Sequence, residues 1–229
     1  MRLRRHASVC VFATMVATGV SANSWNVGPG STGAPQDAQE TPEGTCVTCH
    51  ATAALNPDAD ARLELQGLPE HYLPGVRYTV TLAIEHADAD RLRWGFALTA
   101  VAPERPGNAG RLIATDRQNT RLLKGERRAY LVHTYPGTAI GRSGGQRWTF
   151  DWVAPLSDVG EIAFFTSVVA ADADGTEHGD LVYGPTPAAL AVTAGPSAAR
   201  EAAAEAEAEP DAEEPAADSS ADAAEPQAP

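Results

Sequence analysis

Sulfur-bearing residues are scarce in this chain of 229 residues, and their positions limit the chemistry open to it. There are three cysteines and two methionines, and Met1, Met15 and Cys10 all fall within the first 22 residues. Only Cys46 and Cys49 follow. One closely spaced pair cannot form a framework of several disulfides, so the fold must depend on an apolar core. Methionine ligation of an iron is likewise excluded beyond residue 22.

Long apolar runs are also missing. The only candidate, Ala7 to Val20, is short for a membrane span and follows the basic residues Arg2, Arg4 and Arg5. Small residues then lead up to Ala22. The pattern predicts a signal peptide over residues 1–22, with an uncleaved N-terminal anchor as the alternative. We therefore expect an exported protein that is periplasmic, secreted or held at the cell surface.

Basic stripes are absent, because the chain has 17 basic and 30 acidic residues and a net charge of −13. This excludes the electrostatic footprint of a nucleic-acid-binding protein. From Ser197 onward there are ten acidic residues and a single basic one, Arg200, in a stretch rich in Ala, Glu and Pro. We expect residues 196–229 to be a disordered acidic tail. It has no apolar span, so no transmembrane anchor is expected after signal cleavage.

The two remaining cysteines belong to the motif Cys46-Val47-Thr48-Cys49-His50. A CxxCH motif is typical of covalent c-type haem attachment. The motif predicts one haem c, with thioether bonds to Cys46 and Cys49 and with His50 as the proximal ligand of the iron. Two alternatives remain open. An exported pair can form a disulfide or a redox-active dithiol, and zinc can bind if further ligands lie nearby.

A sixth iron ligand must come from another side chain or from water. His133 lies within a predicted strand, which can hold an imidazole at a fixed position, so it is the candidate distal ligand. His71, His86 and His178 are alternatives, with Lys124 as a weaker donor and a five-coordinate or water-ligated iron as a further possibility. Ligation by two histidines predicts a low-spin iron with a lower potential than a His/Met centre.

Beyond residue 75 the apolar residues alternate with polar ones, which is the period of a β-strand. Turn-forming clusters rich in Gly, Pro, Asn and Asp separate the alternating stretches. The pattern predicts an antiparallel, immunoglobulin-like β-sandwich over residues 67–195, preceded by a haem-attachment segment over residues 23–66. Strands are expected around 76–85, 94–98, 111–115, 130–132, 148–152, 162–171, 181–183 and 190–193, and a short helix is expected within 51–65.

Two charged clusters accompany the predicted strands. Arg121, Lys124, Arg127 and Arg128 indicate either a solvated hairpin turn or a site that neutralises haem propionates or steers an acidic redox partner. The acidic stretch from Asp172 to Asp180 indicates either a surface turn or a calcium loop. Its glycine spacing departs from that of an EF-hand, and no closing glutamate is present.

Several short motifs together resemble a known family. They are Gly33-Ala34-Pro35 ahead of the CxxCH motif, Tyr72-Leu73-Pro74-Gly75-Val76, Arg93-Trp94-Gly95-Phe96, Trp148-Thr149-Phe150-Asp151-Trp152 and Gly179-Asp180. In this order they resemble exported bacterial proteins of the choice-of-anchor type, in which a single haem motif precedes a Reeler-like domain. The resemblance implies an immunoglobulin-like β-sandwich and implies no enzyme activity. The acidic tail departs from the family, which has a membrane anchor at this end.

The sequence therefore predicts an exported monohaem c-type cytochrome fused to a Reeler-like β-sandwich. We expect single-electron transfer to a redox partner such as another cytochrome. The alternative is an extracellular binding, adhesion or gas-sensing module in which the haem is structural or sensory. No nucleophile elbow or phosphate loop is present, so an electron carrier or binding protein is expected rather than an enzyme.

Overall fold

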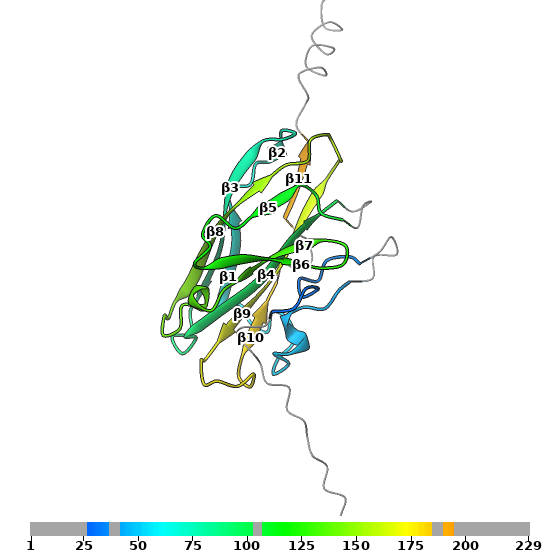
Figure 1. The fold of residues 1–229 in the computed structure, drawn as a ribbon. Coiled ribbons are helices and arrows are strands. Elements are labelled where there is room, and N and C mark those ends of the chain that lie inside the picture. The colour runs from blue at the N-terminus through cyan, green and yellow to red at the C-terminus, as the bar shows by residue number, and fades with distance from the viewer. Residues whose placement is uncertain (1–26, 37–41, 103–106, 185–189, 195–229) are drawn as a thin grey trace, which may run out of the picture. The chain divides into compact units, whose positions relative to one another are not determined.

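The computed structural model describes residues 27–36, 42–102, 107–184 and 190–194 (Figure 1). The predicted signal peptide over 1–22 and the predicted acidic tail over 196–229 lie outside these residues. Within the described ranges, no helix has the length and apolar character needed to cross a membrane.

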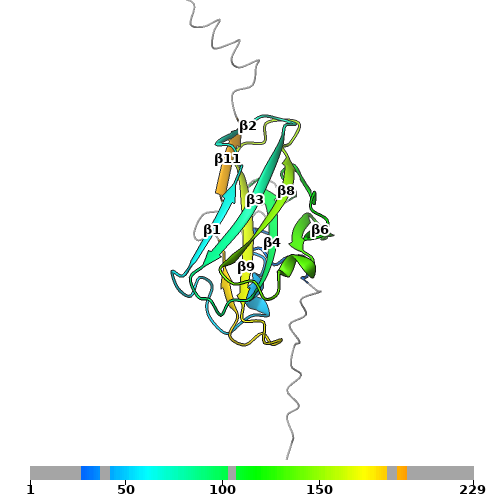
Figure 2. The ribbon, with the colours of Figure 1, turned by 90° about the vertical axis from the view of Figure 1, so that its left-hand side faces the viewer.

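Two β-sheets pack face to face, which confirms the predicted antiparallel β-sandwich (Figures 1 and 2). The first sheet has the order β1-β3-β8-β5 and the second has the order β2-β11-β9-β4-β7-β6, with β10 paired to β9. All pairs are antiparallel except β2 with β11. The strands are β1 (Ala61–Gln66), β2 (His71–Tyr72), β3 (Arg77–His86), β4 (Arg93–Val101), β5 (Arg111–Ile113), β6 (Thr120–Lys124), β7 (Ala129–His133), β8 (Gly145–Val153), β9 (Ile162–Ala171), β10 (Leu181–Tyr183) and β11 (Leu190–Ala194).

The core between the sheets consists of the alternate residues that the sequence pattern singled out. Large aromatic side chains fill it, and the three buried tryptophans Trp94, Trp148 and Trp152 lie at its centre. Each indole N–H donates to a backbone carbonyl, at 2.8 to 2.9 Å. Because a buried indole must satisfy its N–H, these bonds fix the tryptophans within the core as well as burying them.

The short helix predicted within 51–65 is wrong. Residues 61–66 form β1, which pairs with β3 through a continuous antiparallel register. Ala61, Leu63 and Leu65 pack against the core at every second position, and this period fits a strand rather than a helix. The sandwich therefore begins before residue 67, inside the segment that was expected only to carry the haem motif.

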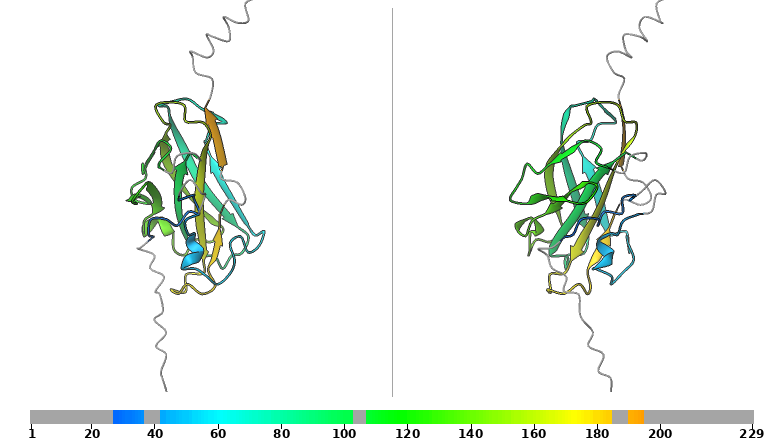
Figure 3. Two further views of the ribbon diagram at one scale, coloured as in Figure 1. Left: turned by 90° about the vertical axis from the view of Figure 1, so that its right-hand side faces the viewer. Right: turned by 45° about the vertical axis from the view of Figure 1, so that its right-hand side comes forward.

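An N-terminal strap, which we define as residues 27–36 and 42–45, covers the outer face of the second sheet. Figure 3 shows this blue and light-blue segment alongside the strands. Val27 packs against Ala97, Tyr130 and Val132 on that face. The strap closes on itself through bridges between Thr32 and Thr45 and between Pro35 and Pro42.

Polar groups hold the strap at one buried carboxylate. Glu43 is 6% exposed and accepts hydrogen bonds from the backbone N–H and the hydroxyl of Thr32 and from the hydroxyl of Tyr130. Burial and the hydrogen bond to Glu43 raise the pKa of Tyr130, so its hydroxyl keeps the proton that it donates. Arg127 and Arg128 donate to strap carbonyls, at Gln36 and Pro35 respectively.

The strap and the residues that follow it, up to Leu55, account for two features of the sequence. The run over β9 is apolar on both faces because the sandwich covers one face and the N-terminal segments cover the other. Of the basic cluster, Arg127 and Arg128 bind the strap backbone, and Arg121 and Lys124 lie in β6, a strand that the sequence pattern did not reveal.

Candidate haem-attachment site

The CxxCH motif forms a single tight helical turn. Residues Cys46–Thr48 are a 3₁₀ helix, η1, and the side chain of Thr45 caps its N-terminus by accepting from the N–H of Val47. The carbonyl of Cys46 accepts from the N–H of Cys49 at 3.2 Å and from that of His50 at 2.9 Å. Residues three apart on a 3₁₀ helix eclipse one another, so Cys46 and Cys49 lie on one side of the turn.

The turn is docked on the outer face of β9. The N–H of Cys46 donates to the hydroxyl of Ser167 at 3.1 Å, and Cys46 and Val47 pack against Val169 and Val182. Cys46 is thereby partly buried, whereas Cys49 is exposed, and neither is in a disulfide. The start of the motif is therefore tied to a rigid strand, and its second thiol faces solvent.

The environment of Cys46 bears on the redox-pair alternative. Burial raises the pKa of the Cys46 thiol to about 11, despite the hydrogen bond with Ser167. Cysteines that exchange disulfides have a lowered pKa, because the thiolate is the attacking species. A thiol with a raised pKa disfavours this alternative.

His50 contacts a buried carboxylate. Its Nδ1 lies 2.6 Å from Oδ2 of Asp180, which precedes β10 and is 2% exposed. We assign the proton to Nδ1, since a carboxylate accepts a hydrogen bond, and this leaves the lone pair on Nε2. A carboxylate behind a histidine in this way is the usual arrangement for an imidazole that binds a metal through its other nitrogen.

Asp180 has a second notable property. Its Oδ1 is buried and has no hydrogen-bond partner among the described residues. Leaving a buried carboxylate oxygen unpaired is costly, so the contact of Oδ2 with His50 is the interaction among the described residues that offsets the burial of this side chain. Sequence reasoning named Asp180 as part of the acidic stretch and of the Gly179-Asp180 motif, but it missed the contact with His50, because the two residues are 130 positions apart.

The loop that carries Asp180 is fixed to the residues after the motif. The hydroxyl of Thr52 donates to the carbonyl of Glu177 and accepts from the N–H of Gly179. Asp172 and Asp174 accept from backbone N–H groups two residues further on, which is the geometry of an Asx turn. The described residues contain no group of three or more His, Cys, Asp or Glu side chains placed to hold a metal ion.

His133, the candidate distal ligand, lies at the end of β7 and is 7% exposed. Its Nδ1 is 2.9 Å from the backbone nitrogen of Phe96 and 3.1 Å from the carbonyl oxygen of the same residue. Two tautomers satisfy this geometry. If Nδ1 donates to the carbonyl, Nε2 has a lone pair for a metal, and if Nδ1 accepts from the N–H, the proton is on Nε2.

The ring of His133 fits beside Gly95. A Cβ atom at Gly95 would come within 2.8 Å of Cε1 of this imidazole, so the ring occupies the space that a side chain would take. Gly95 is directly opposite Val169, and side chains of opposite residues point to the same face. His133 and the motif therefore share the outer face of the second sheet, separated by two strand spacings, or about 10 Å.

The other histidines differ in their hydrogen bonds, their burial and their place in the fold. His86 is buried, with Nε2 2.8 Å from the hydroxyl of Tyr183 and Nδ1 accepting from the N–H of Asp88, so both nitrogens are bonded. Burial lowers its pKa. His71 lies in β2, at the end of the sandwich away from η1 (Figure 1), and His178 is exposed in the loop before Asp180.

Comparisons with known proteins give similarities of fold. No protein-family model and no curated protein sequence matches the chain. Two crystal structures of the Reeler domain of F-spondin, one of them human, are each 21% identical with TM-score 0.44. The human domain aligns over 66% of this chain and 99% of its own length, and the other over 65% and 96%. A cohesin module from Clostridium perfringens is 11% identical, with TM-score 0.37 over 59% of this chain and 95% of that module.

The difference in burial between the two thiols leads to a prediction. In protein prepared without haem attachment, iodoacetamide at pH 8 should label Cys49 well before Cys46. A pKa of about 11 leaves roughly one Cys46 in a thousand as thiolate at that pH. Labelling of Cys46 should accelerate as the pH approaches 11. Trypsin leaves both cysteines in one peptide, because the next cleavage site after Arg5 is Arg62, so fragmentation of that peptide in the mass spectrometer would follow the two sites separately. In guanidinium chloride the two rates should converge; equal rates in the native protein would contradict this account.

Proposed function

We propose that this chain binds one haem c through thioether bonds to Cys46 and Cys49, with His50 as the proximal ligand. The observation that carries the proposal is the bond between Nδ1 of His50 and the buried carboxylate of Asp180. Because Nδ1 is bonded to Asp180, the lone pair of the other ring nitrogen, Nε2, is left to bind a metal. The same bond fixes the orientation of the imidazole ring, as a metal ligand requires. The haem would supply one-electron oxidation and reduction.

The residues around the motif fit this role. The helical turn places both thiols on one side, as attachment to one porphyrin requires, and the Thr45 cap and the bond to Ser167 hold the turn in place. Cys49 is exposed and His50 is only partly buried, so the open side of the turn faces solvent. An exposed site favours direct exchange of electrons with another protein.

His133 is our proposed sixth ligand, in its tautomer with Nδ1 donating to the carbonyl of Phe96. The shared outer face and the space at Gly95 support this assignment. His86 is disfavoured, since ligation would break the hydrogen bonds that both of its nitrogens make.

The function proposed for the whole protein is single-electron transfer in an exported location, with a redox protein such as another cytochrome as partner. We propose a carrier rather than an enzyme, without nucleic-acid partners. A second candidate is an extracellular binding or gas-sensing module. It is favoured by the other tautomer of His133, in which Nε2 carries a proton and leaves the sixth position of the iron open.

Attachment of the haem is tested directly. The protein should be produced with a cytochrome maturation system, and a denaturing gel stained for haem should show a covalent band. The single substitutions Cys46→Ala and Cys49→Ala should each leave one thioether and shift the pyridine haemochrome spectrum, and the double substitution should abolish the band. Ser167→Ala is the control, because it removes a contact of the turn but no thiol. Fully matured wild-type protein without a haem band would disprove the proposal.

Asp180 should influence the potential of the iron. Its negative charge behind His50 makes the imidazole a stronger electron donor, which favours the oxidised iron. Asp180→Asn should therefore raise the midpoint potential in a spectroelectrochemical titration. Asp90→Asn is the matched control, since Asp90 is an exposed acidic residue and the change in net charge is the same. An equal shift in the two variants would show that only the overall charge matters.

The sixth ligand separates the two candidate functions. If His133 ligates the iron, His133→Ala should convert a low-spin absorption spectrum to a high-spin one and allow reduced protein to bind carbon monoxide. His178→Ala is the control and should leave the spectrum as it is. An unchanged low-spin spectrum in His133→Ala would rule out this ligand, and rapid carbon monoxide binding by the wild type would favour the sensing module.

A further inference from the structure

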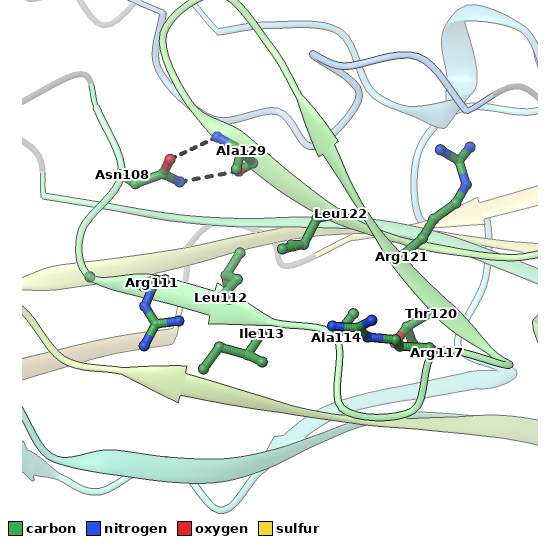
Figure 4. Close-up of a pocket in the computed structure, with 11 residues that line it drawn as sticks. Asn108, Arg111, Leu112, Ile113, Ala114, Arg117, Thr120, Arg121, Leu122 and Ala129 are labelled. Atoms are coloured by element: carbon green, nitrogen blue, oxygen red, sulfur yellow. Dashed lines mark hydrogen bonds between the residues drawn. The ribbon is translucent and has the colours of Figure 1, made fainter.

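A pocket lies at the open edge of the sandwich, away from the haem motif. β5 ends the first sheet and β6 ends the second, and the pocket opens between these two edge strands. Its volume is about 540 Å³, which lies within the usual range for sites that bind small molecules. It is lined mainly by β5, β6 and the connection between them (Figure 4).

The floor of the pocket is apolar. Leu112 is opposite the core residue Trp152, and Leu122 is opposite the core residue Leu131, so both leucines face the space between the sheets. Leu112 is buried, but Leu122 is 45% exposed. An inward-facing leucine that is nearly half exposed shows that the core is left uncovered at this edge.

The rim of the pocket is positively charged. Arg111 begins β5 and Arg117 lies in the connection to β6, and both belong to the lining together with Arg121. Among the described residues the lining contains no acidic side chain, although the whole chain has a net charge of −13. Arg111 and Arg117 make no side-chain hydrogen bond or ion pair with any residue in the described ranges.

The sticks in Figure 4 show how these groups are arranged. Leu112 and Leu122 extend toward each other, whereas Arg121 points away from the other lining residues. Asn108 closes one end by a pair of hydrogen bonds with the backbone of Ala129, at 2.7 and 3.1 Å. This pair fixes the start of β7 to the loop before β5, so that end of the pocket is preformed.

We infer that this pocket binds an organic anion with an apolar body. The body packs between Leu112 and Leu122, and the acidic group pairs with Arg111 or Arg117 at the rim. An apolar body gains from leaving water, and guanidinium groups that have no partner among the described residues gain a charge-assisted bond. Neither a neutral apolar compound nor a small inorganic anion satisfies both parts of the site. The inference is independent of the haem, because no motif residue lines the pocket.

Three probes separate the contribution of the apolar ring to binding from that of the negative charge. Their binding to the mature, haem-loaded protein is measured by isothermal titration calorimetry. Naphthalenesulfonate has both the ring and the charge, naphthalenesulfonamide has the ring without the charge, and methanesulfonate has the charge without the ring. We expect saturable binding of naphthalenesulfonate, with affinity at least tenfold weaker for each of the other two. Equal binding of the sulfonamide, or no saturable binding of the sulfonate, would overturn the inference.

Substitutions then locate the site. Arg111→Gln or Arg117→Gln should weaken naphthalenesulfonate binding by about tenfold, which is the loss expected for one charge-assisted hydrogen bond. Leu122→Gln should weaken both aromatic probes, and because Leu122 is half exposed this variant should still fold, as its melting curve would verify. Arg62→Gln is the control, since Arg62 lies in β1 at the opposite edge of the first sheet. Unchanged affinity in both rim arginine variants, or an equal loss in the control, would also overturn the inference.

Discussion

The contact between His50 and Asp180 joins the haem motif to the sandwich. The two residues are 130 positions apart, and the contact forms because η1 lies on β9 and Asp180 leads into β10, the neighbour of β9. A carboxylate that is 2% exposed needs a partner, because burying an unpaired charge costs several kcal/mol. The orientation of the His50 imidazole thus depends on the assembled sheet.

The contact between His50 and Asp180 forms on the outer face of the second sheet. In many sandwiches such a face is solvated, but here the strap and η1 cover it, and this explains why β9 is buried on both sides. Apolar contacts alone do not hold the strap. Glu43, Tyr130 and Arg128 fasten it through buried polar bonds, which specify one position more narrowly than apolar packing does.

The position of the His133 ring depends on the glycine at position 95. Gly95 has no side chain, and the ring of His133 takes the vacant space on the face that carries the motif. His133 is two residues after the core residue Leu131 on β7. Because side chains of a strand alternate between its two faces, the imidazole would be expected to point into the core. The absence of a side chain at Gly95 therefore leaves the space beside β4 that the ring of His133 occupies.

The sequence by itself determined the sandwich, most of its strands, and the motif residues Cys46, Cys49 and His50, since strand period and motif spacing are local properties. It did not reveal β1, β2, β6 or the role of Asp180. The sequence over β1 was also compatible with a short helix, and β6 lies within a cluster of basic residues, so pairing with β3 and β7 decides both strands. The role of Asp180 and the position of the His133 ring arise from contacts between distant segments. Only the packing of the sheets brings those segments together.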